Sequence, residues 1–282
     1  MHNDGPFEYR HALGYSSEQL AHILSHCFED YLVPFVIDGP GFAGRFGAED
    51  LSLGDSVVVI HRQQPVAIAL IARRGQHSRV AALSIRPEMR GKGLGQTLMR
   101  RLVSDARARG DRRLSLEVIE HNDAGLALYH RAGLRIVRTL TGHQAPEPAP
   151  AESVALQEID PLLLSHRLTA EGATDQPWLV APETLFKLPG KPRAFTLDRQ
   201  AYAVVMPGAE KCFLRMIYVP PPQRGKGHAR TLLAALQTRF APLPLAAGVY
   251  VPEVAAPFFE RLGWRQEPLR QFEMMMTLAS PQ

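Results

Sequence analysis

The pattern of apolar and polar positions predicts a strand, a turn and a helix in the middle of the first half of the chain. Apolar and branched residues dominate positions 80–85, and Pro87 ends this predicted strand because its nitrogen has no hydrogen for a sheet. From there on, apolar side chains recur at four-residue steps on one helix face, at Leu94, Leu98, Leu102 and Ala106. Gly110 is a natural helix end.

The same order of elements returns later in the chain. A predicted strand at 217–219 is followed by prolines and then by a helix with Leu232, Leu233, Leu236 and Phe240 on one side. Arg90 and Arg224 begin the two turns and are 134 residues apart. A repeat of this length predicts two similar domains, not a solenoid.

The rest of the pattern fits around these two centres. Residues 30–53 mix aromatic residues with glycine and proline, which favours a packed loop. Predicted strands lie at 9–13, 57–61, 66–72, 113–119 and 134–140 in the first half and at 201–206, 213–219, 245–251 and 274–278 in the second. Predicted helices start at Ser16 or Ser17, at Asn122 or Asp123, and at Val254.

Each central turn is rich in glycine and carries basic residues. Glycines let backbone N–H groups converge, and the start of a helix adds a partial positive charge, so the first turn predicts a phosphate or pyrophosphate site. Two other phosphate loops are excluded. The dinucleotide fingerprint requires glycine where Gln96 stands, and the Walker loop requires Ser or Thr where Gly93 follows Lys92.

The Arg-x-x-Gly-x-Gly/Ala spacing resembles the acetyl-CoA loop of the GCN5-related N-acetyltransferase (GNAT) family. The run from Leu116 to Gly133 resembles a second signature of this family, with Asn122 and Tyr129 at its characteristic positions. The resemblance implies a tandem α/β (α+β) protein, in which each domain has a mixed, mostly antiparallel sheet flanked by helices. We expect a catalytic domain at 1–142, a Pro/Ala-rich linker at 143–153 and a second GNAT-like domain at 154–282.

The resemblance also implies which residues hold acetyl-CoA. Backbone groups near Leu83 to Ile85 would pair with the pantetheine arm, the amides of the turn would hold the pyrophosphate, and Asn122 would bind the pantetheine end. The implied residues are Leu83, Ser84, Ile85, Arg90, Gly91, Lys92, Gly93, Leu94, Gly95, Gln96 and Asn122. The second loop would consist of Arg224, Gly225, Lys226, Gly227, His228 and Ala229.

The expected chemistry is direct attack of an amine on the thioester within a ternary complex. By the resemblance, Tyr129 points at the sulfur, and its phenol would protonate the departing thiolate. In the predicted strand, the side chain of Glu117 points to the opposite face from Leu116 and Val118, so its carboxylate can reach the cleft. We expect this carboxylate to act as the base that accepts the amine's proton. Neither Cys27 nor Cys212 lies near a motif, which argues against a covalent intermediate.

The second half departs from the pattern. Aligning Gly263 with Gly133 places Phe259 opposite Tyr129 and Pro252 opposite Asn122. Phenylalanine has no proton to donate and proline has no polar side chain. We therefore expect the second half to have lost the catalytic residues, and whether it binds CoA is left open.

Composition narrows the functional classes. The 282 residues carry a formal charge of +4 and a pI near 9.2, which suits an anionic co-substrate and is too small an excess to indicate nucleic-acid binding. No metal-binding motif, secretory signal or membrane-spanning run is visible, so we expect a cytoplasmic protein. The expected function is acetyl transfer from acetyl-CoA to a primary amine. The alternatives are a non-catalytic CoA sensor or scaffold and a different acyl donor, and a homodimer is left open.

Overall fold

The computed structural model describes residues 7–147, 154–173 and 175–278. Contacts divide the chain into two compact units. Unit 1 is Met1–Val137 together with Phe272–Gln282, and unit 2 is Arg138–Gln271. We expected one boundary near residue 142; the contacts place it after Val137 and assign Phe272–Gln282 to unit 1 as well. Of the expected linker, residues 148–153 lie outside the described residues.

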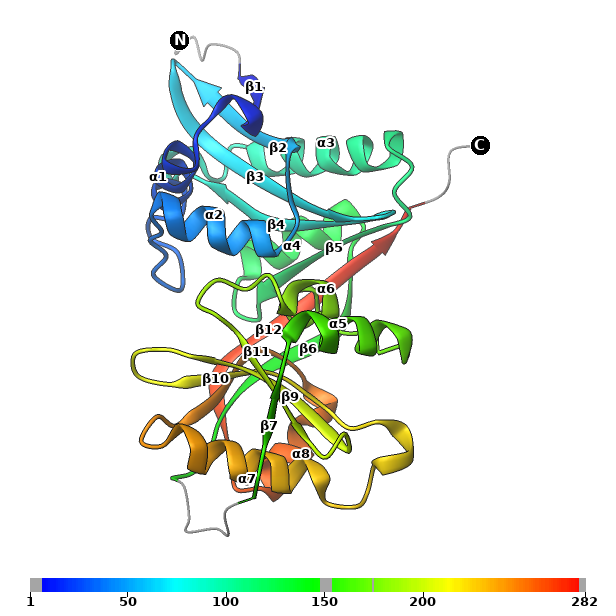
Figure 1. The fold of residues 1–282 in the computed structure, drawn as a ribbon. Coiled ribbons are helices and arrows are strands. Elements are labelled where there is room, and N and C mark those ends of the chain that lie inside the picture. The colour runs from blue at the N-terminus through cyan, green and yellow to red at the C-terminus, as the bar shows by residue number, and fades with distance from the viewer. Residues whose placement is uncertain (1–6, 148–153, 174, 279–282) are drawn as a thin grey trace. The chain divides into compact units, whose positions relative to one another are not determined.

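Unit 1 is a mixed sheet with helices on both faces (Figure 1). Its strands are ordered β1-β2-β3-β4-β5, with the end of β12 beside β5; β1 to β4 pair antiparallel, and β4 and β5 pair parallel. In chain order its elements are β1 (Glu8–His11), α1 (Ser17–Cys27), α2 (Gly39–Ala48), β2 (Leu51–His61), β3 (Gln64–Arg74), β4 (His77–Ile85), α3 (Leu94–Ala108), β5 (Arg113–Ile119) and α4 (Asp123–Ala132).

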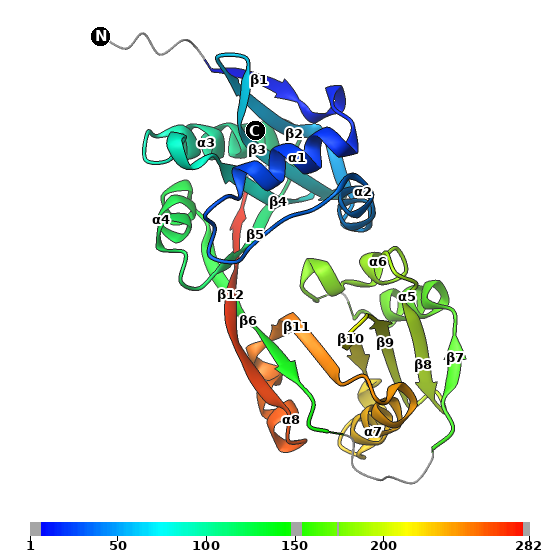
Figure 2. The same ribbon diagram turned by 90° about the vertical axis from the view of Figure 1, so that its left-hand side faces the viewer.

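Two apolar layers cover the sheet of unit 1. Leu20, Leu24 and Phe46 of α1 and α2 pack on one face, together with Ile68 and Leu70. The other face packs against α3 and α4, through residues such as Leu98, Leu102 and Tyr129. Figure 2 shows α3 and α4 on one side of the unit and α2 on the other. This arrangement follows from the period-two alternation of strand side chains.

Helix α2 lies inside the segment that we expected to be a loop, so that expectation was wrong. Asp38 caps the helix by accepting a hydrogen bond from the amide of Gly41 at 2.7 Å, and Pro40 stands in the first turn. Phe42 and Phe46 are four residues apart and both are buried. These signals outweigh the low helix propensity of the glycines.

Unit 2 repeats this architecture with a different set of strands. Its sheet order is β6-β11-β10-β9-β8-β7, with β12 beside β6. Its elements are β6 (Arg135–Gln144), β7 (Gln157–Ile159), α5 (Pro161–Ala170), α6 (Pro182–Leu185), β8 (Arg193–Leu197), β9 (Ala201–Pro207), β10 (Cys212–Tyr218), α7 (His228–Phe240), β11 (Leu245–Pro252), α8 (Ala256–Arg261) and β12 (Arg265–Thr277).

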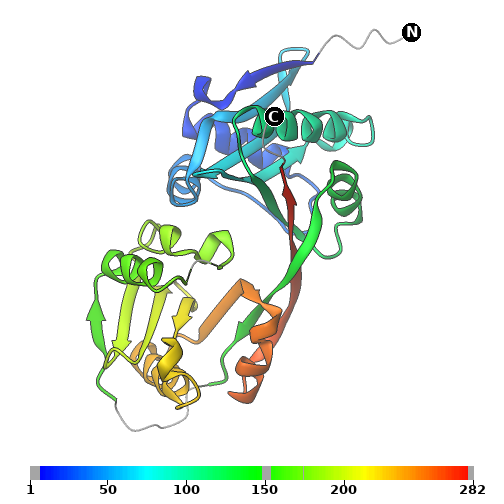
Figure 3. The same cartoon turned by 90° about the vertical axis from the view of Figure 1, so that its right-hand side faces the viewer.

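The strands β6 and β12 are exchanged between the two halves of the chain. Strand β6 follows α4 of the first half but pairs antiparallel with β11 of unit 2. Strand β12 starts in unit 2 and ends in unit 1, beside β5 (Figure 3). The sequence prediction had residues 134–140 close the first sheet and 274–278 the second. In the structure β6 pairs with β11 of unit 2 from Leu140 onward, and residues 274–278 belong to unit 1. No helix of the described residues is long and apolar enough to cross a membrane.

Candidate active site

A bulge and a gap in the sheet of unit 1 create the space for a site. Val80 pairs with Ile71 and Ala82 with Leu70, so Ala81 is an extra residue in β4. Strands β4 and β5 pair from His77 to Val80 and then separate. Beyond Val80, one edge of β4 pairs with β3, and the edge toward β5 is unpaired. The predicted residues Leu83, Ser84 and Ile85 lie in this part of β4.

The glycine turn follows β4 and opens into α3. Gly91 and Gly93 have φ values of +74° and +81°, which side chains disfavour, so glycine is strongly favoured at both positions. Within the part of the chain that the structure describes, the amides of Gly91, Lys92 and Gly93 donate to no backbone carbonyl. The first amides of α3, from Leu94 to Gln96, have no helical acceptor either. The turn therefore presents a row of free N–H donors.

Arg90 has a different role from the one we expected. Its amide donates to the carbonyl of Pro87 at 3.1 Å, so it is not among the free donors. Its guanidinium donates to the carbonyls of Ile85 at 2.8 Å, Glu29 at 2.7 Å and Cys27 at 3.2 Å. Arg90 therefore ties the end of α1 to the end of β4 and positions the turn.

Asn122 begins α4 and makes two side-chain hydrogen bonds. Its oxygen caps the helix by accepting from the amide of Gly125 at 2.9 Å. Its Nδ2 donates to the hydroxyl of Tyr31 at 3.3 Å. Tyr31 comes from the segment between α1 and α2 and stacks edge-on against Phe28. Sequence reasoning did not single out Tyr31, and its only signal was the concentration of aromatic residues in that segment.

Tyr129 lies on α4 and is 8% exposed. It packs in the core that α3, α4 and β5 share. Burial, and to a smaller extent the neighbouring Tyr31, raise the pKa of Tyr129 well above its ordinary value. The phenol therefore stays protonated at neutral pH and can act as a hydrogen donor.

Glu117, the expected base, lies in a buried cluster of charges. Its carboxylate accepts from Arg79 Nε at 2.7 Å and from Nη2 at 2.6 Å, and Arg79 Nη1 lies 2.6 Å from Glu49. All three side chains are at most 7% exposed. A buried arginine requires such partners, because a lone charge there would be costly. The structure thus gives Glu117 a structural partner that sequence reasoning missed.

Unit 2 repeats the bulge, the gap and the glycine turn. Arg215 is the extra residue of β10, and β10 pairs with β11 only at Cys212 and Phe213 before the two strands separate. Gly225 and Gly227 have φ values of +78° and +85°. The second turn lines a cavity of about 960 Å³, together with residues 171–173, 175–176 and 217–219 and with Phe258 and Arg261.

The chemical end of the second site is different. Phe259 stands where unit 1 has Tyr129, is 3% exposed and stacks on His143, with ring centroids 4.8 Å apart. Tyr250 reaches across the gap, and its hydroxyl donates to the carbonyl of Leu214 at 2.8 Å. The described residues contain no group of three or more histidine, cysteine or acidic side chains that could hold a metal ion.

Comparisons with known proteins agree with this geometry. Residues 17–134 match the model of the Acetyltransferase (GNAT) family. Curated protein sequences gave no match. A GCN5-related N-acetyltransferase from Sphaerobacter thermophilus superposes with a TM-score of 0.68 at 19% identity, covering 96% of this chain and 95% of that one.

Two further solved structures also match over nearly the whole chain. A putative acetyltransferase from Pyrococcus horikoshii has a TM-score of 0.69 at 13% identity, covering 99% of this chain and 93% of that one. A tandem GNAT protein from the clavulanic acid biosynthesis pathway has a TM-score of 0.63 at 16% identity, covering 98% and 100%. At such identities the likeness shows the fold alone, and that fold is the tandem arrangement expected from the sequence. Residues 17–134 form an acetyltransferase domain of the GNAT family, as the two sequence signatures predicted.

Proposed function

We propose that unit 1 transfers an acetyl group from acetyl-CoA to a primary amine. The observation that carries this proposal is that one unit combines a buried phenol, a strand edge left unpaired beyond Val80 and a turn of free amides. Tyr129 packs in the same core cluster as Val80 and Leu116, the last residues that pair before β4 and β5 separate. The free amides of the glycine turn follow at the end of the same strand.

The residues present fit a CoA thioester. The amides of Gly91 to Gly93 and the first turn of α3 would hold the pyrophosphate. The unpaired edge at Leu83 to Ile85 would pair with the pantetheine arm, and Asn122 would hold its end. When bound, acetyl-CoA supplies an acetyl group activated as a thioester.

We assign Tyr129 the role of general acid. Burial raises its pKa, so the phenol carries its proton at neutral pH and has one to donate to a departing thiolate. We do not assign Glu117 as the base that accepts the amine's proton, because its carboxylate is paired with Arg79. In the proposal, Glu117 and Glu49 hold the side chain of Arg79, which lies two residues before the bulge of β4.

The test is thiol release from acetyl-CoA in the presence of a panel of primary amines. Tyr129→Phe should lower kcat by about 10²–10⁴-fold, the usual contribution of a positioned acid, and leave the KM for acetyl-CoA within about twofold. Tyr202→Phe is the matched control, because Tyr202 is a buried tyrosine of unit 2, 2% exposed. It should leave the rate unchanged.

The alternative is a CoA-binding sensor or scaffold without turnover. If CoA binds but neither the native protein nor Tyr129→Phe releases thiol from acetyl-CoA with any amine, unit 1 is a CoA-binding sensor or scaffold and not a transferase. If thiol is released equally by both, Tyr129 is not the acid. The amine that is acetylated fastest in the panel then identifies the acceptor class.

A further inference from the structure

Arg215 is the extra residue of the β10 bulge in unit 2. A bulge re-aims the side chain that it carries. This side chain lines a cavity of about 240 Å³ between β10 and β11. The cavity is otherwise mostly apolar, with Leu214, Val251, Val254 and Phe259 among its lining residues. A cation therefore faces an apolar pocket.

The partners of Arg215 do not neutralise its charge. Nη2 donates to the carbonyl of Leu179 at 3.0 Å, and the guanidinium carbon lies 4.5 Å from the ring centroid of Tyr250. Nε is buried and has no hydrogen-bond partner. Over the described ranges, no carboxylate forms an ion pair with Arg215. Arg79 of unit 1, by contrast, has two carboxylate partners.

A guanidinium in an apolar pocket is stabilised by an anion that brings its own charge into the pocket. Its fork of N–H donors matches a carboxylate, which accepts two of them at once. We propose that this cavity binds a carboxylate on an apolar body, with Arg215 as its counter-ion.

The neighbouring cavity indicates the favoured source of this carboxylate. The 240 Å³ cavity shares Gln176 and Ile217 with the larger cavity, which the second glycine turn lines. A CoA thioester whose acyl chain ends in a carboxylate fits both cavities. Its phosphates lie at the turn and its acid lies at Arg215. The ligand is bound and not converted, because Phe259 has no proton to donate. A free carboxylic acid is the other source of the same chemistry.

Unit 1 lacks this feature. Ala81 is the extra residue of the matching bulge in β4, so no side-chain cation stands there. The proposed preference for an acid therefore belongs to unit 2 alone. It does not depend on the transferase activity of unit 1.

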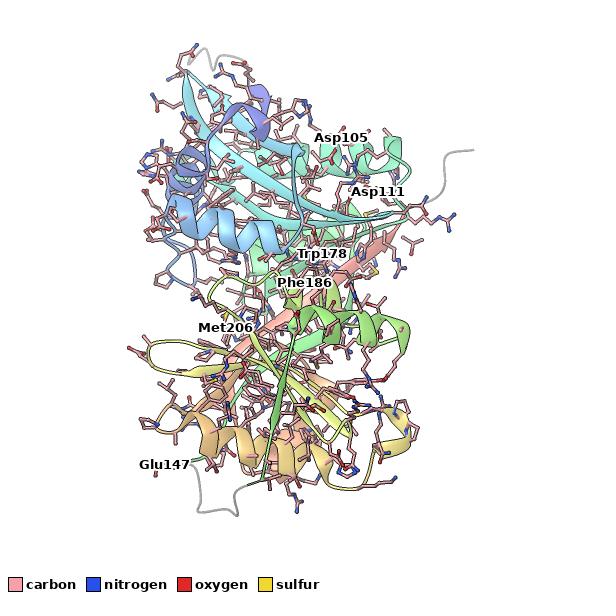
Figure 4. The ribbon with its side chains drawn as sticks, viewed as in Figure 1. Asp105, Asp111, Glu147, Trp178, Phe186 and Met206 are labelled. Carbon is pink, nitrogen blue, oxygen red and sulfur yellow. The ribbon has the colours of Figure 1, made fainter. Side chains whose placement is uncertain are left out.

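The natural fluorescence of the chain reports on unit 2 specifically. Trp178 and Trp264 are the only two tryptophans, and both belong to unit 2. Trp264 contacts Phe259 with ring centroids 5.0 Å apart, and Phe259 lines the 240 Å³ cavity. Trp178, labelled in Figure 4, directly precedes Leu179, which accepts the hydrogen bond of Arg215.

The experiment titrates the full-length protein and follows tryptophan fluorescence. The ligands are succinyl-CoA, butyryl-CoA, CoA and free succinate. Succinyl-CoA and butyryl-CoA have acyl chains of equal length and differ in the terminal carboxylate. We expect succinyl-CoA to bind about tenfold or more tightly than butyryl-CoA, the scale of a hydrogen bond between charged groups. If free succinate, and neither thioester, saturates the fluorescence change, the ligand is a free carboxylic acid.

Arg215→Gln should abolish the difference between the two thioesters, and Arg215→Lys should retain part of it. The matched control is Arg199→Gln, which removes a positive charge from a separate cavity of about 290 Å³ in the same unit and should leave the difference intact. Equal affinities for the two thioesters in the native protein overturn the proposal, and this outcome requires no variant to fold. An unchanged preference in Arg215→Gln also overturns it. Loss of thiol release by unit 1 would change neither result.

Discussion

At the scale of single residues, the two units differ at a few matched positions that decide their chemistry. Tyr129 and Phe259 occupy the same place after the same kind of gap, and one can donate a proton while the other cannot. Ala81 and Arg215 occupy the same bulge, and only the second is charged. The two units therefore share the bulge, the gap and the glycine turn, and they differ in the side chains placed there.

Buried charges in unit 1 have structural roles, and Asp111 is the clearest case. It is 1% exposed and accepts hydrogen bonds from Arg109 at 3.0 Å, from Arg73 at 3.2 Å and from Ser78. Asp111→Asn removes the charge that these two arginines face. We expect it to lower the free energy of unfolding by about 3–5 kcal/mol, measured by urea denaturation.

The matched control for Asp111→Asn is Asp105→Asn. Asp105 pairs with Arg101 at 3.5 Å, and its side chain is 44% exposed. Figure 4 labels both aspartates, with Asp111 at the connection between α3 and β5. The exposed pair should contribute at most about 1 kcal/mol. Equal losses in the two variants would show that burial does not determine the strength of this network.

At the scale of elements, local signals were read correctly and long-range pairings were not. Helix α1 starts after Ser16, whose side chain forms a capping box with Gln19, and α4 ends at Gly133 in the left-handed conformation. Both ends depend on residues within one turn, so the sequence predicts them. The glycine turns are equally local, and both follow their strands as expected.

The exchange of β6 and β12 had no local signal. Each strand follows a short helix and a glycine, Gly133 in one case and Gly263 in the other. Either strand has the apolar residues to close either sheet, so sequence pattern cannot choose the partner. Helix α2 was missed for another reason, because the count of glycines and prolines outweighed Asp38 and the pair of Phe42 and Phe46.

At the candidate site, the motif predicted the glycine turn between β4 and α3. It did not predict the side-chain partners of Arg90 and Glu117. Those partners come from segments distant in sequence, namely the end of α1 and strand β4. A pattern of spacing within one segment carries no information on such contacts.

The exchanged strand β12 makes unit 1 dependent on the end of the chain. Met274 is fully buried in the core that contains Tyr129, and Leu278 is 2% exposed there. A chain that stops at Gln271 should therefore lose thiol release, while the fluorescence of Trp178 and Trp264 in unit 2 stays native. Met274→Ala should cost about 2–5 kcal/mol of stability, whereas Thr277→Ala at an exposed position should cost less than about 0.5 kcal/mol. Full activity of the shortened chain would contradict this dependence.

At the scale of the whole molecule, the duplication does not produce two independent domains. Each half of the sequence gives one strand to the unit built mainly by the other half. Main-chain groups of a buried strand are costly to leave unpaired, so we expect each half alone to lack part of its sheet.

Cutting the chain between its halves tests this interdependence directly. A protease site in place of residues 148–153 would separate β6 from β7 in the chain without removing either exchanged strand. We expect the two fragments to elute together in gel filtration after complete cleavage and to separate only in denaturant, because β6 stays paired with β11 and β12 stays beside β5. Thiol release should survive the cut. The same cut in a chain that ends at Gln271 leaves only one of the two exchanged strands, so its fragments should separate at lower denaturant. Fragments that part under native conditions would show that the exchange does not hold the halves together.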